Sequence, residues 1–77
     1  MKVKIFSTPD CSWCVKAKEY LKEKNIQFEE IDVSKDQQAA MEMVKKTKQM
    51  SVPVIEINGE YVIGFDKEKI DKLLKEE

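Results

Sequence analysis

The amino-acid sequence predicts an α/β fold in which strands and helices follow the order β-α-β-α-β-β-α. Three observations predict this order. Four short runs are rich in β-branched and aromatic residues, three stretches place apolar residues at helical spacing, and Asn58-Gly59 joins the last two of the short runs. The chain has 77 residues, 42% of them hydrophobic, which is enough for one modest core. We therefore expect a single domain over residues 1–77.

The first part of the chain is expected to form a strand, a helix and a second strand. Val3-Lys4-Ile5-Phe6 is the first strand, and residues 7–10 form a turn after it. The helix starts at Cys11, and helical spacing then joins Val15, Ala17, Lys18, Tyr20, Leu21 and Lys24. Residues 26–33 are the second strand. We expect it to run parallel to the first, because the helix between them is long enough for a crossover connection.

A second helix is expected in the middle of the chain. Ser34 and Gln37 are spaced as a capping box, which places the start of the helix at Ser34. Its inward stripe consists of Ala40, Met43, Val44 and Thr47, with Met41 beside it. We expect the methionines to fill the core rather than to line a ligand site, because a flexible thioether side chain adapts to irregular gaps.

The last part of the chain predicts a hairpin and a third helix. Residues 52–57 form the third strand and residues 61–63 the fourth, and Asn58-Gly59 between them is a strong hairpin signal. Asp66 is expected to cap the helix that follows. Its inward residues are Ile70, Leu73 and Leu74.

The two cysteines of the chain lie three positions apart in Cys11-Ser12-Trp13-Cys14. A thiol pair at this spacing can open and close a disulfide. Cys11 falls at a helix start, where unpaired backbone N–H groups and the helix dipole favour an anion. Such positions lower a thiol pKa from about 8.5 into the range ~3.5–7.5. We expect Cys14 to lie one turn further in, within reach of the first sulfur but shielded from solvent.

Other interpretations of the pair remain open from the residues alone. A structural disulfide would close so short a loop that it removes little chain entropy. A zinc site needs about four ligands, and the chain offers no histidine and only these two cysteines, so a dimer would have to complete it. Two inert core cysteines would be unusual in a turn before a helix.

Composition excludes several classes of partner. The 14 basic and 15 acidic residues nearly balance, so nucleic acid is not an expected partner. No apolar stretch approaches the ~20 residues of a membrane span, and the first residues lack a secretory signal. We expect a cytoplasmic protein that acts as a monomer. In that reducing compartment a lone cysteine pair favours catalysis over structure.

The cysteine pair, the element order and the Ser51-Val52-Pro53 segment together resemble the glutaredoxin branch of the thioredoxin superfamily. The resemblance covers essentially the whole chain. It implies the thioredoxin fold, with a four-stranded mixed sheet and helices on both faces, and a cis bond before Pro53, facing the cysteines. Pro53 also has a purely structural interpretation, because proline at the first residue of a strand removes no ladder hydrogen bond.

The resemblance assigns roles by position. Cys11 matches the exposed nucleophile and Cys14 the resolving cysteine. Val52 matches the residue whose backbone pairs with the substrate, with Pro53 beside it. Trp13 occupies an aromatic position that can cover a partner, although its ring can equally fold back over the helix.

The chain also departs from the usual glutaredoxin pattern. Thr8 stands where many members have a lysine, Met50 where a basic residue is common, and Gly64-Phe65-Asp66 replaces paired glycines. These changes remove expected contacts to the carboxylates of glutathione, although Lys16 and the helix start at Asp66 offer substitutes. Gly64-Phe65 instead resembles the small redoxins that reduce ribonucleotide reductase and take electrons from thioredoxin reductase.

The sequence therefore predicts a dithiol–disulfide oxidoreductase that reduces protein disulfides through Cys11 and Cys14, without a bound cofactor or metal. Its electron donor would be glutathione or a flavoprotein of the thioredoxin reductase type. Three rivals stay open: a monothiol glutaredoxin that removes glutathione from proteins, a dimer bridged by a metal or cluster, and a binding domain without redox activity.

Overall fold

The computed structural model describes residues 2–75, so the expected domain over residues 1–77 extends beyond the described part at both ends. Its sheet has the strand order β2-β1-β3-β4. The elements are β1 (Val3–Ser7), α1 (Ser12–Glu23), β2 (Glu29–Asp32), α2 (Gln37–Thr47), β3 (Val54–Ile57), β4 (Glu60–Ile63) and α3 (Lys67–Lys75). Strand β1 pairs in parallel with β2 and antiparallel with β3, and β3 pairs antiparallel with β4. The predicted α/β order and mixed sheet are confirmed.

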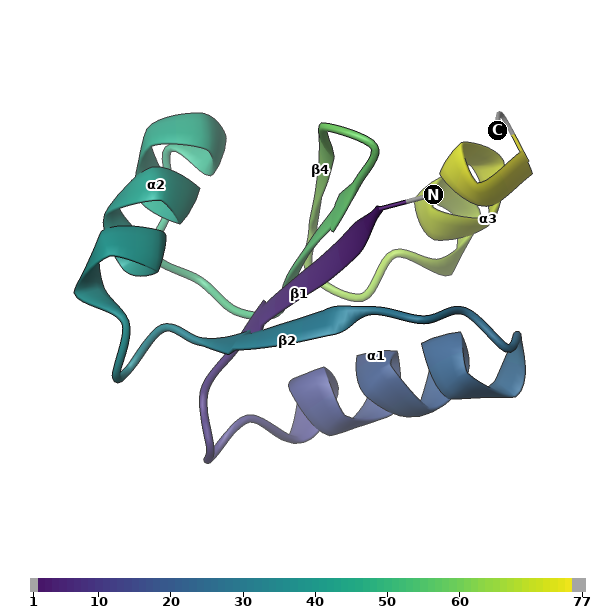
Figure 1. Ribbon diagram of the computed structural model, residues 1–77, viewed down its shortest axis with the longest axis horizontal. Coiled ribbons are helices and arrows are strands. Elements are labelled where there is room, and N and C mark those ends of the chain that lie inside the picture. The colour runs from purple at the N-terminus through teal and green to yellow at the C-terminus, as the bar shows by residue number, and fades with distance from the viewer. Residues whose placement is uncertain (1, 76–77) are drawn as a thin grey trace.

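Two apolar clusters cover the two faces of the sheet, because successive strand residues point to opposite faces. On one face, Ile5 and Ile55 pack with Leu21 of α1 and Ile70 of α3. On the other face, Phe6 packs with the residues of α2. Helices α1 and α3 therefore lie on one side of the sheet and α2 on the other, as Figure 1 shows.

Local signals fixed the starts of α1 and α3 and the hairpin as predicted. Cys11 is the N-cap of α1, and the carboxylate of Asp66 accepts a hydrogen bond from the Lys69 amide at the start of α3. Asn58 and Gly59 have φ angles of 50° and 90°, which is the two-residue turn that joins strands with a right-handed twist. The inward positions of α3 are also confirmed, since Leu73 and Leu74 pack beside Ile70.

Two predicted strands are shorter than expected. Strand β2 begins at Glu29 rather than at residue 26, because the amide of Ile26 donates to the Leu21 carbonyl and closes the end of α1. Strand β3 begins at Val54 rather than at Val52, since Pro53 has no N–H to contribute to a ladder. Ile26 still packs against the core from its loop.

The predicted start of α2 was wrong. The carboxylate of Asp32 accepts hydrogen bonds from the amide and the hydroxyl of Ser34, which holds Ser34 in a turn before the helix. The N-cap is instead Asp36, which accepts from the Ala39 amide at 3.0 Å. Because Asp32 holds Ser34 in this turn, the N-cap lies two residues later than predicted.

The inward faces of the first two helices also differ in part from prediction. Ala39, Met43 and Thr47 are the buried residues of α2, so the stripe is rotated by about one residue from Ala40 and Val44. Met43 fills the core as expected, whereas Met41 and Met50 are 69% and 75% exposed. Val15 of α1, which helical spacing grouped with Ala17 and Leu21, is 46% exposed, whereas those two are buried.

None of the helices within residues 2–75 is long and apolar enough to cross a membrane. The longest of them, α1, has 12 residues, against about 20 for a typical span.

Candidate functional site

The cysteine pair lies at the carboxyl end of β1, where the chain turns into α1. Cys11 and Cys14 are joined in a disulfide with a Cα–Cα distance of 5.2 Å. The backbone of Cys11 is extended and that of Cys14 is helical, so the pair spans the first turn of α1. The two cysteines are therefore placed as the sequence predicted, with one at the helix start and one inside the helix.

The two sulfurs have different surroundings. Cys14 is completely buried, whereas Cys11 is half-buried at the surface. The backbone N–H of Cys14 donates to Cys11 Sγ at 3.0 Å. Residues 12–15, the first turn of α1, carry no acidic side chain to oppose a negative charge there. The arrangement can therefore stabilise a thiolate on Cys11 once the disulfide is opened.

The segment before β3 reaches the same end of the sheet. In the antiparallel pairing of β1 with β3, Phe6 lies opposite Val54. Pro53, the residue before Val54, therefore lies at the end of β1 from which the chain turns toward the cysteines. The Val52–Pro53 peptide bond is cis, as the resemblance implied. The Pro53 carbonyl accepts from the Gly64 amide at 2.8 Å, and Val52 packs against the apolar cluster under α2.

Aromatic side chains continue the surface beside the cysteines. The ring centroids of Trp13 and Phe65 are 6.3 Å apart, and those of Tyr20 and Phe65 are 5.5 Å apart in a T-shaped pair. The Lys16 ammonium lies 4.6 Å from the centre of the Trp13 ring. Trp13 nevertheless remains 56% exposed. It can therefore contact a partner without first leaving its contact with Phe65.

Four of the predicted binding residues share one open hollow of about 630 Å³. Its lining consists of Trp13, Lys16, Ile63, Phe65, Asp66, Lys67 and Glu68. Gly64 lies in the chain between Ile63 and Phe65, which line this hollow. Its amide hydrogen bond to the Pro53 carbonyl links that part of the chain to the cis proline. Thr8 is half-buried in the turn before Cys11 and does not line the hollow.

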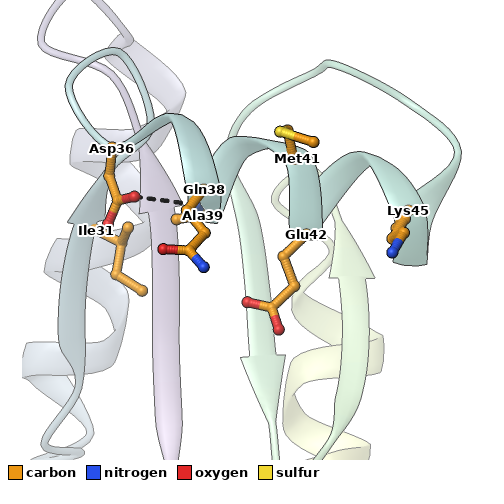
Figure 2. Close-up of a pocket in the computed structure, with 7 residues that line it drawn as sticks. All are labelled: Ile31, Asp36, Gln38, Ala39, Met41, Glu42 and Lys45. Atoms are coloured by element: carbon orange, nitrogen blue, oxygen red, sulfur yellow. Dashed lines mark hydrogen bonds between the residues drawn. The ribbon is translucent and has the colours of Figure 1, made fainter.

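Sequence reasoning did not anticipate the surface around α2. One hollow lies between the helix and β2 and is shown in Figure 2, with Asp36 and Glu42 among the residues that line it. A second groove is lined by Met41 and Met50. The sequence signal was present in the three methionines near this helix, but their spacing alone does not separate exposed from buried positions.

A half-exposed cysteine at a helix start, disulfide-bonded to a buried cysteine on this mixed sheet and followed by a cis proline, defines a thiol–disulfide oxidoreductase. The comparisons with known proteins agree. The sequence model of the family described as Glutaredoxin matches residues 3–62. A glutaredoxin-like 8.6 kDa protein from the rubredoxin operon of Clostridium pasteurianum is 51% identical over 73 residues, covering 95% of this chain and 97% of that protein. Glutaredoxin 1 of Rickettsia conorii is 40% identical and covers 92% of this chain and 78% of its own.

Solved structures show the same fold. The thioredoxin-like protein BC3987, in its T8A mutant, superposes with a TM-score of 0.89 at 41% identity, over 99% of this chain and 97% of that one. NrdH-redoxin from Escherichia coli superposes with a TM-score of 0.86 at 25% identity, over 95% of both chains. The chain belongs to the glutaredoxin family of the thioredoxin superfamily and is a dithiol oxidoreductase.

Proposed function

We propose that this chain reduces disulfides of other proteins, with Cys11 as the nucleophile and Cys14 as the resolving cysteine. The observation that carries the proposal is the difference between the two sulfurs. Only Cys11 is open to solvent, and only Cys11 receives the amide hydrogen bond. An attacking thiol needs both access and thiolate character.

The proposed reaction has two exchange steps. The Cys11 thiolate attacks one sulfur of the partner's disulfide and forms a mixed disulfide, while the partner's other sulfur leaves and takes a proton. Cys14 then loses its proton and attacks Cys11 Sγ, which re-forms the Cys11–Cys14 bond and releases the partner's second thiol. The cysteines carry the two electrons themselves, so the cycle includes no resident cofactor. The disulfide seen in this structure is the end point of the second step.

We further assign the partner-binding surface to the residues around the pair. The backbone of Val52, beside Pro53, would pair with the extended backbone of the substrate. The remaining contacts would come from Thr8, Trp13, Lys16, Gly64, Phe65 and Asp66. We expect the protein to act as a monomer in the cytoplasm, in electron transport and redox homeostasis. A monomer suits a small electron carrier that binds its partners one after another.

The proposed electron donor is a flavoprotein of the thioredoxin reductase type rather than glutathione. Phe65 fills the place beside α3 where a glycine would let glutathione approach. In the same hollow the carboxylates of Asp66 and Glu68 offset the two cations, Lys16 and Lys67. The exposed Trp13 ring offers an apolar contact to a protein donor instead. The glutaredoxin-like NrdH-redoxin, which has a thioredoxin-like activity profile, supports this choice.

The test compares two donors on one substrate. Insulin reduction is coupled either to NADPH and a bacterial thioredoxin reductase, or to glutathione, glutathione reductase and NADPH. We expect turnover with the flavoprotein to exceed turnover with glutathione by about tenfold or more, because each lost contact to a glutathione carboxylate is worth ~1.5–3 kcal/mol. Efficient turnover with glutathione but not with thioredoxin reductase would contradict the proposed electron donor. If neither donor supported insulin reduction, the proposed function itself would be contradicted.

A variant pair sharpens the test. Thr8→Lys combined with Phe65→Gly restores the usual basic residue and glycine, and should raise glutathione-coupled turnover. The matched control keeps Phe65→Gly but adds its lysine at Gln27, an exposed residue before β2 at the other end of the sheet. Equal gains in both variants would show that Thr8 is not a glutathione position.

A further inference from the structure

A groove with an apolar floor runs along α2 beside the hollow in Figure 2, with which it shares Met41 and Lys45. Its apolar lining comes from Val33, Ala40, Met41, Val44 and Met50, and its volume is about 930 Å³. Met41 and Met50 expose more than two-thirds of their surface. Exposed methionines are unusual in a small domain, and their flexible side chains fit apolar partners of different shapes.

The charges around α2 are distributed unequally. The charged residues that line the groove are both cationic, Lys45 and Lys48. The neighbouring hollow shares Lys45 with the groove but adds two carboxylates, Asp36 and Glu42, which the groove does not have. Figure 2 shows Met41 and Glu42 pointing to opposite sides of α2. The groove therefore offers apolar contact together with positive charge, and an occupant with apolar and acidic side chains complements it.

The groove lies at the same end of the sheet as the cysteines. Val33, which lines the groove, donates its amide to the carbonyl of Ser7, the last residue of β1. Met50, which also lines the groove, leads through Ser51 directly to the cis Val52–Pro53 bond. The groove is thus continuous with the edge at which the substrate backbone is proposed to pair.

We propose that this groove binds a segment of the protein substrate that flanks the reactive disulfide and carries apolar side chains next to Asp or Glu. The inference rests on the proposed function and specifies its substrate class. Cys11 would supply the exchange chemistry, and the groove would select proteins whose disulfide lies near an acidic, apolar stretch. The apolar side chains would contact Met41 and Met50, and the carboxylates would pair with Lys45 and Lys48.

The test uses synthetic peptide disulfides that release a quenched fluorophore when reduced. The test peptide joins its cysteine, through Gly/Ser spacers of several lengths, to a segment of Leu and Glu placed before or after the cysteine. One twin has Lys in place of Glu, and another has Ser in place of Leu. We expect reduced wild-type protein to cleave the Leu/Glu peptide about tenfold faster than either twin, with the preference over the Lys twin shrinking at high salt.

Two neighbouring lysines give a matched pair of variants. Lys45 lines the groove and Lys46 does not, yet both are exposed and lie in the last turn of α2. Lys45→Glu and Lys46→Glu therefore change net charge and the helix dipole interaction equally. We expect Lys45→Glu to remove most of the preference for the Leu/Glu peptide over its Lys twin, and Lys46→Glu to keep it. Equal effects of the two variants would overturn the inference.

Hydroxyethyl disulfide separates failure of the groove from failure of the function. Equal rates with all peptides, alongside normal reduction of hydroxyethyl disulfide, would overturn the groove and leave the oxidoreductase intact. Failure to reduce any of these disulfides would overturn the proposed function and the groove with it. A concentration-dependent dimer in sedimentation that Met41→Glu abolishes would assign the groove to a second copy of this chain instead.

Discussion

The backbone N–H of Cys14 donates a hydrogen bond to Cys11 Sγ at 3.0 Å, so the proposed resolving residue can also stabilise a thiolate on the proposed nucleophile. The contact follows from helix geometry, because an N-cap side chain accepts from an amide in the first turn. It uses the backbone of Cys14, so it does not depend on the thiol of that residue. Substitution of the Cys14 side chain should therefore leave the activation of Cys11 in place.

The first prediction is that reduced Cys11 has a pKa below the ordinary thiol value of about 8.5, because the helix start and the Cys14 amide favour its thiolate. Alkylation by iodoacetamide, followed against pH by mass spectrometry, measures it. Cys11 should react well below pH 8, and Cys14, which is buried, should react only slowly. Preferential alkylation of Cys14 near neutral pH would reverse the assigned roles.

The second prediction concerns Cys14→Ser. In the proposed reaction Cys14 attacks from within the same helix turn, so its effective concentration at Cys11 would far exceed that of any free thiol. The variant should accumulate mixed disulfides on Cys11 and lose about tenfold or more of its turnover with protein disulfides. Non-reducing gels and insulin reduction measure the two effects. Undiminished turnover would instead support the monothiol route.

Features fixed by short-range chemistry were predictable from the sequence. The Asn58-Gly59 turn and the caps at Cys11 and Asp66 depend on a few neighbouring residues, and all three are present. The prediction of where α2 starts was wrong, because Asp32 accepts a hydrogen bond from the Ser34 hydroxyl and Asp36 caps the helix instead. A capping pattern in the sequence does not show whether the serine will cap the helix or donate its hydroxyl to a nearby carboxylate instead.

The surroundings of the cysteine pair were only partly predictable. The cis Val52–Pro53 bond came from resemblance and not from composition or periodicity. Contact of Phe65 with Tyr20 joins residues far apart in the chain, so no local pattern indicates it. Exposure of Met41 and Met50 likewise depends on how α2 rotates over the sheet. These features depend on long-range packing, which a single sequence does not specify.

The third prediction tests the backbone at Gly64, whose φ is +79°. A Cβ built there would meet no heavy atom within 4 Å, so Gly64→Ala adds no clash. The cost should be that of a left-handed conformation, about 1–2 kcal/mol in the free energy of unfolding. Urea denaturation measures it. A loss well beyond this range would show that the Gly64–Pro53 hydrogen bond had also broken.

The last prediction concerns a polar cluster that joins α1 to α3. The Tyr20 hydroxyl donates to the Asp71 carboxylate, and the Lys24 ammonium lies 3.3 Å from the same carboxylate. The hydrogen bond from Tyr20 is the largest cause that lowers the pKa of Asp71 below its ordinary 3.8. The same bond raises the pKa of Tyr20 above 10.0.

The signs of these two pKa shifts set the pH dependence of stability. Below pH 3.8, Asp71 binds a proton more readily in the unfolded chain than in the folded chain. The contribution of the Tyr20–Asp71 pair to the free energy of unfolding is therefore lost as pH falls through the lowered folded pKa of Asp71. Above pH 10.0 the unfolded Tyr20 ionises first, and the contribution falls as pH rises through the raised folded pKa. Tyr20→Phe should therefore destabilise the protein most between these limits and progressively less outside them.

Urea midpoints across pH measure this dependence, with Tyr61→Phe as the control. Burial is the largest cause that raises the pKa of Tyr61, and Asp71 is not among the groups that shift it. The control should therefore leave the acid-side dependence attributed to Asp71 unchanged. In an Asp71→Asn background, Tyr20→Phe should lose its acid-side pH dependence, because the two residues act as one pair. If Tyr20→Phe, which keeps the ring, had no effect on stability at any pH, ring packing on Phe65 and not the hydrogen bond would stabilise this contact between α1 and α3.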